Sequence, residues 1–434
     1  MSAVHLVIRA ALALSGFTTR GAADTVTLDY TVGGVHVLQR VTPGNDIVAV
    51  DLYLVGGVQQ LTPATAGLEA LALKAAQYGT ARYPGAAARH ALTRTGSEWV
   101  VDPETDWTMV GFRGVADQFD SSWVAFADRI VHPTLDSDAV ALARERLIRE
   151  SRLHGMSPEA VAWETADSLA FEGHPYALNP SGTEASLTHL TPDAVRRYVH
   201  DHFVTSRMLL VVVGNIPRAR LEALVAATLG TLPPGQYAWA PPAEVPRHPS
   251  SLAMVSRISP TNYLVGYYTG PSVRSPDYAA FELATELLSA RVSTAVRYRL
   301  SLSYAAGAPY QGRGISSGAL YASTPQPSLV LGVMRQQLDS VRQDRLPSWV
   351  MRDFVKEFTL DHLMDQESNE AQAAALARAQ LYFGDYRQAD AQLDILRRVK
   401  PGDLPRVAKL YMHDFHFVYV GDTTHMRRDW VKGW

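Results

Sequence analysis

Residues 47–57 read IVAVDLYLVGG, a run of apolar and β-branched residues that ends in two glycines. Such a run, bounded by a turn signal, is typical of a β-strand. A second run of this kind, TNYLVGYYTGP, occupies residues 261–271, and a turn and a helical pattern follow each of the two. Gly56 and Gly270 lie at the ends of these runs, and the interval between them is close to half of the chain. The chain therefore repeats one unit at a long interval.

A second pair of landmarks gives nearly the same interval. RMLLVVVGNIP at residues 207–217 corresponds to FHFVYVGDTT at residues 415–424, and Gly214 and Gly421 end the apolar parts of these two runs. A period of about 200 residues is too long for a solenoid repeat. We therefore predict two homologous domains. Helical patterns, such as residues 276–300, separate the strands in each half, which favours α+β domains, each a mixed β-sheet with helices packed on one face.

A proline-rich stretch, TLPPGQYAWAPPAEVPRHPS, lies between the two repeats at residues 231–250. Its six prolines favour a stiff, extended and exposed linker. We accordingly expect an N-terminal domain at residues 25–232, a linker at 233–249 and a C-terminal domain at 250–434.

Composition narrows the classes of partner. The chain has 434 residues, with 40 basic and 43 acidic side chains and a net charge near −3, so it offers no polybasic surface for nucleic acid or anionic lipid. It contains no cysteine, which excludes thiolate metal sites and disulfides. No segment is apolar over a length sufficient to span a membrane.

The N-terminal segment, residues 1–24, predicts a location outside the cytoplasm. A short apolar stretch follows Arg9, and small residues precede a candidate cleavage point after Ala23. This pattern is that of a weak secretory signal, which predicts a periplasmic or secreted protein. The alternative is an uncleaved tail on a cytoplasmic protein.

Residue patterns alone reveal no self-contained active site. The 14 histidines include no His-x-x-Glu-His motif, whose spacing places two imidazoles on one helical face to bind zinc. His200 with His202, and His413 with His416, are closely spaced, but a solvated helix end and the start of a strand explain them better than metal binding. There is no Gly-x-Ser-x-Gly elbow and no glycine-rich phosphate loop.

One helical segment, TAGLEALALKAAQYGT at residues 65–80, has an apolar stripe for the core at i, i+3, i+4 and i+7. The stripe leaves Ala70, Leu73 and Lys74 elsewhere on the helix. The segment resembles the first-helix signature of the pitrilysin/insulinase metallopeptidases, a family that includes the mitochondrial processing peptidase. Gly67-Leu68 and Gly79-Thr80 keep the frame in which that family has Gly-Leu, His-x-x-Glu-His and Gly-Thr.

The resemblance implies a zinc site that has lost its ligands. Ala70, Leu73 and Lys74 stand where the family has its first ligand, general base and second ligand. Alanine and leucine have no lone pair, and an ammonium repels a dication. The family's third ligand is a glutamate at a characteristic spacing after the second histidine, and Glu150 stands at that spacing after Lys74. A lone carboxylate does not hold a catalytic zinc, so we expect no metal on this chain and a solvated or ion-paired Glu150.

The second half keeps another part of the family's machinery. VRYRLSLSYAAG at residues 296–307 resembles the family's Leu-Arg-Glu-x-x-Gly-Leu-Ala-Tyr segment, with Arg297 and Tyr304 in place and Tyr298 and Ser301 as departures. In active relatives this Arg/Tyr pair reaches across a closed clamshell to hold the substrate carbonyl, for which both side chains are suitable donors. The alternative makes Arg297 a surface cation and Tyr304 a core aromatic.

Residues 96–112, GSEWVVDPETDWTMVGF, resemble the family's substrate-pairing edge strand. Asp106 and Thr108 match it, whereas Val100-Val101-Asp102-Pro103 replace its Asn-Ala-x-Thr run. Pro103 lacks the amide donor of a strand ladder. Peptide binding by strand addition is therefore not expected in this half.

The resemblance implies a division of labour between two chains. We predict a non-zinc subunit, inactive alone, that pairs with a homologous zinc-bearing subunit in a heterodimeric metalloendopeptidase acting on unfolded peptides. Arg297 and Tyr304 would bind the substrate carbonyl in trans. The main alternative is a catalytically inert structural or peptide-binding relative, like the core subunits of respiratory complexes. An unrelated hydrolase is a third possibility.

Overall fold

The computed structural model describes residues 26–246 and 248–434. The candidate leader at residues 1–24 lies outside this part of the chain. Across the described residues, no helix combines the length and the apolar character that a membrane crossing requires.

The first half is built on a six-stranded sheet in the order β1-β2-β6-β3-β5-β4. Its strands are β1 (Thr27–Val32), β2 (Val35–Val41), β3 (Ile47–Val55), β4 (Glu98–Pro103), β5 (Trp107–Val115) and β6 (Met208–Gly214). Its helices are α1 (Leu68–Ala75), α2 (Ala86–His90), α3 (Phe119–Val131), α4 (Ser137–Met156), α5 (Pro158–Ala170), α6 (Glu184–His189), α7 (Pro192–His202) and α8 (Arg218–Ala227).

The second half has its own sheet, in the order β10-β11-β8-β12-β7, with β9 paired to β11. Its strands are β7 (Ser251–Ser256), β8 (Asn262–Ser272), β9 (Ala306–Gly307), β10 (Tyr310–Gln311), β11 (Ile315–Thr324) and β12 (His416–Gly421). Its helices are α9 (Tyr278–Ser293), α10 (Pro327–Gln343), α11 (Ser348–Asp365), α12 (Asn369–Phe383), α13 (Gln388–Arg397) and α14 (Asp403–Tyr411).

The two sheets have equivalent topologies. The order β2-β6-β3-β5-β4 in the first corresponds strand for strand to β7-β12-β8-β11-β10 in the second. β2 pairs with β6 in parallel, as β7 does with β12, and the other corresponding pairs are antiparallel. β3 and β8, which contain the two runs with which the repeat was recognised, are both central strands. The predicted α+β fold with two homologous halves is confirmed.

Each half buries one face of its sheet against its own helices. In the first half a cluster that includes Val50, Leu52 and Phe112 packs against α1, α3 and α7. In the second half the corresponding cluster joins β8, β11 and β12 to α9, α10 and α14. The alternation of side chains along the central strands explains this, because every second residue faces the same helical layer.

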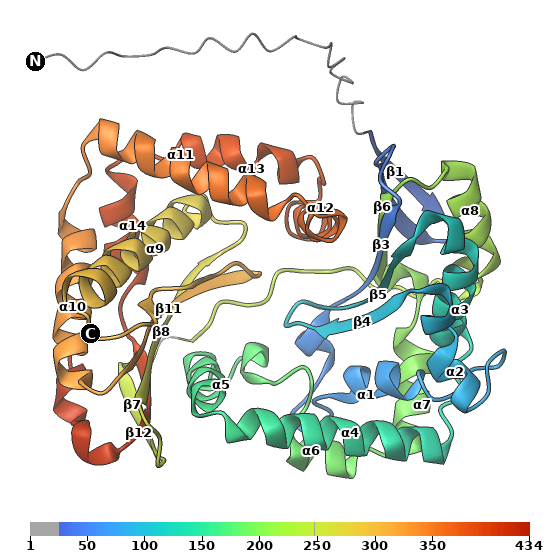
Figure 1. The fold of residues 1–434 in the computed structure, drawn as a ribbon, viewed down its shortest axis with the longest axis horizontal. Helices are drawn as coiled ribbons and strands as arrows, with labels where there is room; N and C mark the ends of the chain where they lie inside the picture. The colour runs from blue at the N-terminus through green and yellow to red at the C-terminus, as the bar shows by residue number, and fades with distance from the viewer. Residues whose placement is uncertain (1–25, 247) are drawn as a thin grey trace, which may run out of the picture.

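The opposite faces of the sheets are covered by an exchange of helices that the sequence did not predict. α12 of the second half packs on β3 and β6 of the first, and α5 of the first half packs on β8 and β12 of the second. Figure 1 shows α12 and α5 in the space between the two sheets. The expectation of helices on one face is therefore incomplete, since each half supplies one helix to the other's second face.

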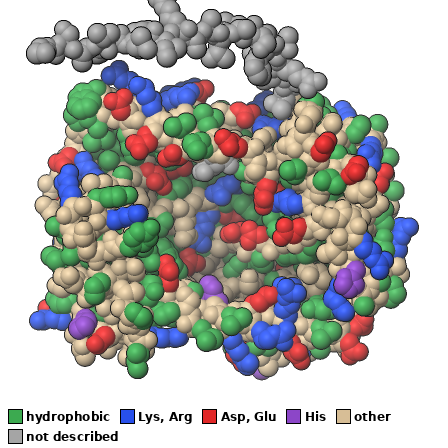
Figure 2. Space-filling model, viewed as in Figure 1, with side chains coloured by type: hydrophobic (Ala, Val, Ile, Leu, Met, Phe, Trp, Pro, Cys, Tyr) green, Lys and Arg blue, Asp and Glu red, His purple; other side chains and the backbone are tan. Residues whose placement is uncertain are grey.

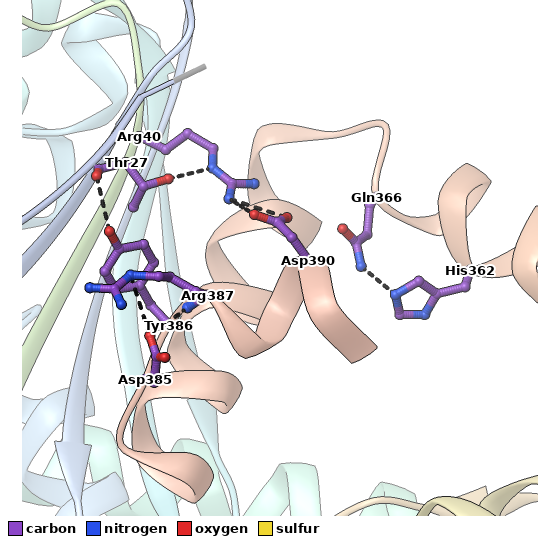
Figure 3. Close-up of polar contacts among 8 residues, drawn as sticks. All are labelled: Thr27, Arg40, His362, Gln366, Asp385, Tyr386, Arg387 and Asp390. Carbon is purple, nitrogen blue, oxygen red and sulfur yellow. Dashed lines mark hydrogen bonds and ion pairs between the residues drawn. The ribbon is translucent and has the colours of Figure 1, made fainter. Parts of the chain in front are cut away.

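Polar contacts also join the halves at the outer end of this junction. Arg40 on β2 reaches Asp390 on α13, with Nη2 3.2 Å from Oδ2, and its Nε donates to the hydroxyl of Thr27. Tyr386 donates its hydroxyl to the carbonyl oxygen of Thr27 at 3.3 Å. Figure 3 shows these side chains meeting between the edge of the first sheet and the helices of the second half.

The linker contacts both halves of the chain, whereas the sequence predicted an exposed segment. Residues 232–246 have no helix or strand, but the backbone of Thr205 and Ser206 donates to the carbonyls of Pro233 and Pro234. Trp239 packs its ring on Tyr382 of α12, and Pro242 is buried. The segment is extended, as its prolines favour, but it is not a freely exposed tether.

The exchanged helices predict that core mutations on α12 destabilise the fold more than mutations on the outer helices. Leu376 on α12 is fully buried in the core shared by the two halves, whereas Leu360 on α11 is 59% exposed. We expect Leu376→Ala to cost about 2–5 kcal/mol of unfolding free energy. Leu360→Ala should cost less than about 0.5 kcal/mol. Urea denaturation measures both, and equal losses would contradict this account of the junction.

Candidate active site and chamber

The helix that resembles the family's zinc helix is buried on nearly all sides. α1 packs against α4 and α7, and its residues Ala70 and Leu73 are 3% and 0% exposed. Gly67 precedes the helix with φ of 85°, and a β-carbon there would lie 2.6 Å from the α-carbon of Gly182. Only glycine fits this approach. The expectation that Ala70 and Leu73 lie on a face apart from the core is wrong, because neighbouring helices enclose α1.

Lys74, in the second-ligand position of that frame, forms an ion pair with Glu150. Its Nζ lies 3.0 and 3.1 Å from the two carboxylate oxygens, and Arg146 Nε lies 3.0 Å from one of them. Partial burial alone would raise the pKa of Glu150, but the hydrogen bonds from Arg146 and Lys74 outweigh it and lower that pKa. Glu150 is thus ion-paired, one of the two environments expected for it.

The structure therefore brings together two of the four positions assigned from the family frame. Lys74 on α1 and Glu150 on α4 are in contact, while Ala70 and Leu73 have no donor atoms. These residues do not fit a zinc ion. Over residues 26–246 and 248–434, no group of three or more histidine, cysteine, aspartate or glutamate side chains is arranged to hold a metal.

The Arg/Tyr pair lies at the end of α9. The helix predicted for residues 276–300 begins at Tyr278, and its last turn, Thr294–Arg299, is π-helical. Ser301 then adopts a left-handed φ of 50°, which turns the chain toward Tyr304. The guanidinium of Arg297 lies 4.4 Å from the ring centre of Tyr304. Tyr304 is 81% exposed, so it is not a core aromatic.

A charged chamber of about 550 Å³ lies between the two halves. Its floor is the inner face of β3, β4 and β5, and its opposite wall comes from the β10 region and α12. Figure 2 shows the molecule hollowed between its halves, with acidic and basic side chains in the hollow. The charged residues that line the chamber are Asp51, Asp102, Glu104, Asp106, Arg113, Arg313, Glu370 and Arg378. Among these described lining residues, neither Arg297 nor Tyr304 occurs.

Asp106 joins the halves beside this chamber. It is 1% exposed, and it accepts hydrogen bonds from the Tyr176 hydroxyl at 2.5 Å, the Tyr382 hydroxyl at 2.7 Å and the Gly314 amide at 2.9 Å. Tyr176 belongs to the first half, and the other two donors belong to the second. The sequence singled out Asp106 only as a match to the family's edge strand, and nothing local in the sequence revealed donors from the other half of the chain.

The predicted edge strand is β4, which lies at the end of the first sheet. Among the described strands β4 pairs only with β5, so its other side is the open edge of the sheet. The amide of Glu104 donates to the carbonyl of Trp107, and paired residues alternate between bonded and non-bonded positions. Pro103 therefore belongs to a position whose backbone groups point to the open edge. Its missing donor falls where an added peptide strand would need one.

Comparison with known proteins shows a likeness to M16 peptidases in fold and, over part of the chain, in sequence. Residues 189–355 match the family model described as the Peptidase M16 inactive domain. The fold is similar to a protease from Helicobacter pylori, with a TM-score of 0.83 and 16% identity, over 92% of this chain and 99% of that one. It is also similar to a peptidase M16 inactive domain from Pseudomonas fluorescens, with a TM-score of 0.81 and 17% identity, over 92% and 98% of the two chains.

The chain is thus similar to M16 peptidases in sequence over part of its length. It is 20% identical to the zinc protease YmxG of Bacillus subtilis over 42% of this chain and 45% of that protein. It is 25% identical to a probable mitochondrial-processing peptidase subunit beta of Schizosaccharomyces pombe over 35% of this chain and 34% of that protein. These alignments span less than half of the curated relatives' length.

Within the M16 fold, this chain combines an intact helical frame with an altered chemistry. The positions that the frame assigns to the second and third ligands still meet, at Lys74 and Glu150. The contact between them is now an ion pair between side chains of opposite charge. This ion pair connects α1 to α4, which pack against each other.

The ion pair predicts the metal content of the protein. We expect the purified chain to bind no stoichiometric zinc and to hydrolyse no peptide by itself, because Ala70 and Lys74 cannot act as ligands. The double variant Ala70→His/Lys74→His supplies two imidazoles at i and i+4 beside Glu150, and it should bind about one zinc per chain. Adding Glu150→Gln should remove that zinc. Elemental analysis after dialysis measures the zinc content of the wild-type chain and of each variant. About one zinc per wild-type chain would contradict the prediction that Ala70 and Lys74 leave no metal site.

A second prediction concerns the pH dependence of folding stability, which we assign to Glu282. Burial raises the pKa of Glu282 on α9 to about 7, an effect that Arg378 partly offsets. Between the pKa of the unfolded chain and about 7, the folded state holds a proton that the unfolded state has lost. Stability from this group therefore falls as pH rises through that window. We expect Glu282→Gln to be about 1–2 kcal/mol more stable than wild type at pH 8 and similar at pH 4.5.

Urea denaturation at the two pH values measures the Glu282 effect. Glu357→Gln is the matched control, because Glu357 is exposed on α11. A constant difference between Glu282→Gln and wild type at both pH values would show that Glu282 is not the titrating group.

Proposed function

We propose that this chain is the non-zinc subunit of a heterodimeric zinc metalloendopeptidase and that its partner is a homologous chain with an intact His-x-x-Glu-His motif. The observation that carries the proposal is the Arg297–Tyr304 pair, which is preserved while the zinc ligands are not. The substrates are unfolded peptides. An exported protein, periplasmic or secreted, fits the sequence pattern of the N-terminal segment, with a cytoplasmic protein as the alternative.

Both side chains of the pair have uncommitted donors. Within the described part of the chain, Arg297 has no hydrogen bond or ion pair, its guanidinium lies over the rings of Tyr298 and Tyr304, and the hydroxyl of Tyr304 has no hydrogen-bond partner. A residue retained for packing alone would be buried or bonded. The guanidinium instead lies over the face of the Tyr304 ring, and both groups keep donors for a substrate carbonyl oxygen.

The surroundings of the pair suit contact with another protein. Tyr298 and Leu300 are 68% and 50% exposed, so with Tyr304 they place three large side chains on the surface of one short segment. Clustered exposed apolar side chains mark interaction surfaces. The patch therefore supports docking of the partner next to the Arg/Tyr pair.

The chemical roles divide between the chains. Zinc on the partner would polarise the substrate carbonyl and supply an activated water. Arg297 holds the carbonyl oxygen of the bound peptide in place and donates to the negative charge that develops on it. Tyr304 donates a second hydrogen bond to the same oxygen, and its ring keeps the guanidinium of Arg297 in position.

A second candidate function has support from the junction. Asp106 and the exchanged helices fasten the two halves together, which suits a rigid scaffold as well as an enzyme subunit. A relative described as cytochrome b-c1 complex subunit 1 of Caenorhabditis elegans is 24% identical over 32% of this chain. In that case the chain would bind peptides or partners without contributing to hydrolysis.

Substitution of the pair separates the two functions. With a zinc-bearing homologue as partner, Arg297→Ala and Tyr304→Phe should each lower turnover on an unstructured fluorogenic peptide by roughly 10²- to 10³-fold, with a smaller change in KM. The expected cause is loss of a donor to the developing oxyanion. Arg299→Ala and Tyr298→Phe, which removes a hydroxyl but keeps the exposed ring, are matched controls on the same segment and should retain turnover.

Size-exclusion chromatography confirms that each variant still forms the complex. Wild-type turnover in Arg297→Ala and in Tyr304→Phe would contradict the catalytic proposal and favour the scaffold. Equal losses in the pair and in the two controls would show that the segment acts through docking rather than through its donors.

A further inference from the structure

The chamber between the halves is lined by charged groups, some of which have no partner among the described residues. Most of the charges are satisfied: Asp51 and Glu370 bind Arg113, and Arg313 binds Asp167. Asp102 and Glu104 are different. Among the described residues, the side chain of neither one has a hydrogen bond or an ion pair, and both are exposed to the chamber.

The carboxylates of Asp102 and Glu104 both face the chamber. Glu104 directly follows β4, and its amide continues the pairing by donating to the carbonyl of Trp107, so its side chain and that of Asp102 project from the same face of the sheet. That face is the chamber floor. Burial and the neighbouring charge of Asp102 raise the pKa of Glu104, while Arg313 and Arg378 oppose the rise. The floor thus presents two carboxylates that no cation of the described residues neutralises by contact.

The opposite wall supplies a cation, Arg378. It lies on α12, and with Glu370 and Ala374 it forms a stripe at intervals of four residues that lines the chamber. Its hydrogen bond is to the carbonyl oxygen of Gly312, and within residues 26–246 and 248–434 no carboxylate pairs with it. Its guanidinium is accessible from the chamber.

A tyrosine on the chamber wall presents a hydroxyl to it. Tyr53 on β3 is 3% exposed, lines the chamber, and packs edge-on against Trp107. In the described part of the chain its hydroxyl has no hydrogen-bond partner. An unpaired hydroxyl on an otherwise buried side chain is a donor and acceptor that a ligand in the chamber can use.

The size of the chamber limits the ligand. A volume of about 550 Å³ is within the range of sites that enclose small molecules. A peptide end of a few residues fits, and its free terminus would lie inside.

We propose that the chamber binds the C-terminal end of a short peptide whose last residue is lysine or arginine. Arg378 takes the terminal carboxylate, since a guanidinium pairs with a carboxylate through two hydrogen bonds. Asp102 and Glu104 take the side-chain cation, and the hydroxyl of Tyr53 bonds to the peptide backbone. The ligand's charges then complement the guanidinium and the two carboxylates that these described lining residues present.

Three peptides test the two charge contacts in the isolated chain. Acetyl-Ala-Ala-Lys with a free carboxylate is the matched ligand, its C-terminal amide lacks the negative charge, and acetyl-Ala-Ala-norleucine lacks the positive charge. We expect isothermal titration calorimetry to give the matched peptide a Kd below about 1 mM. Each of the other two peptides should bind about tenfold more weakly or worse.

Variants assign each preference to its residue. Arg378→Gln should abolish the preference for the carboxylate over the amide, and Arg378→Lys should retain part of it. Asp102→Asn/Glu104→Gln should abolish the preference for lysine over norleucine. Arg352→Gln and Glu357→Gln on the outer surface of α11 are matched controls and should change neither preference. Thermal melts confirm that each variant is folded.

Equal affinity for the three peptides, or no binding of any of them at about 1 mM, would overturn the proposal. So would a folded Arg378→Gln that still prefers the carboxylate by the wild-type factor. Because these titrations need no zinc-bearing partner and no hydrolysis, their failure would leave the role of Arg297 and Tyr304 untouched.

Discussion

The closed arrangement of the two halves depends on how one buried carboxylate is satisfied. Asp106 sits at the end of the β4–β5 turn, where the described residues of the first half offer its side chain the hydroxyl of Tyr176. The second half supplies Tyr382 and the amide of Gly314. A buried carboxylate that lacks donors costs several kcal/mol, so separating the halves would expose the site to water or leave it unsatisfied. The exchanged helices add apolar burial around this point, and the chamber exists because the halves meet here.

The sequence revealed the repeated architecture well because the signals for it are local. The apolar runs that became β3 and β8 each carry their own period and their own turn glycines, so their existence needed no tertiary information. The helix exchange carried no such signal. The apolar residues of α5 and α12 are ordinary for amphipathic helices, and whether they pack on their own sheet or on the other one depends on the geometry of the junction.

The candidate sites also differ in how far the sequence could predict them, according to whether their residues are close together in the chain. The frame of Gly67-Leu68 and Gly79-Thr80 located Lys74 and Glu150, because a motif preserves spacing along the chain. The burial of Leu73 was missed, since an apolar stripe on one face does not reveal that neighbouring helices enclose the others. The chamber was missed because its parts are far apart in sequence: Asp102 and Glu104 come from one edge of the first sheet, and Arg378 comes from a helix of the other half. The ion pair of Lys74 with Glu150 joins α1 to α4, because the ammonium attracts the carboxylate over a contact of 3.0 Å.

The chamber gives the closed state a second source of stability if it binds a peptide end as proposed. The floor that holds Asp102 belongs to the first half, and the wall that holds Arg378 belongs to the second. A ligand that contacts both would bind only to the closed arrangement, so its binding free energy would add to that of the Asp106 contacts. Arg297 and Tyr304, which do not line the chamber among the described residues, would stay accessible to a partner whether it is filled or empty. Ligand binding inside the chain and contact with a second chain would therefore use separate surfaces of one fold.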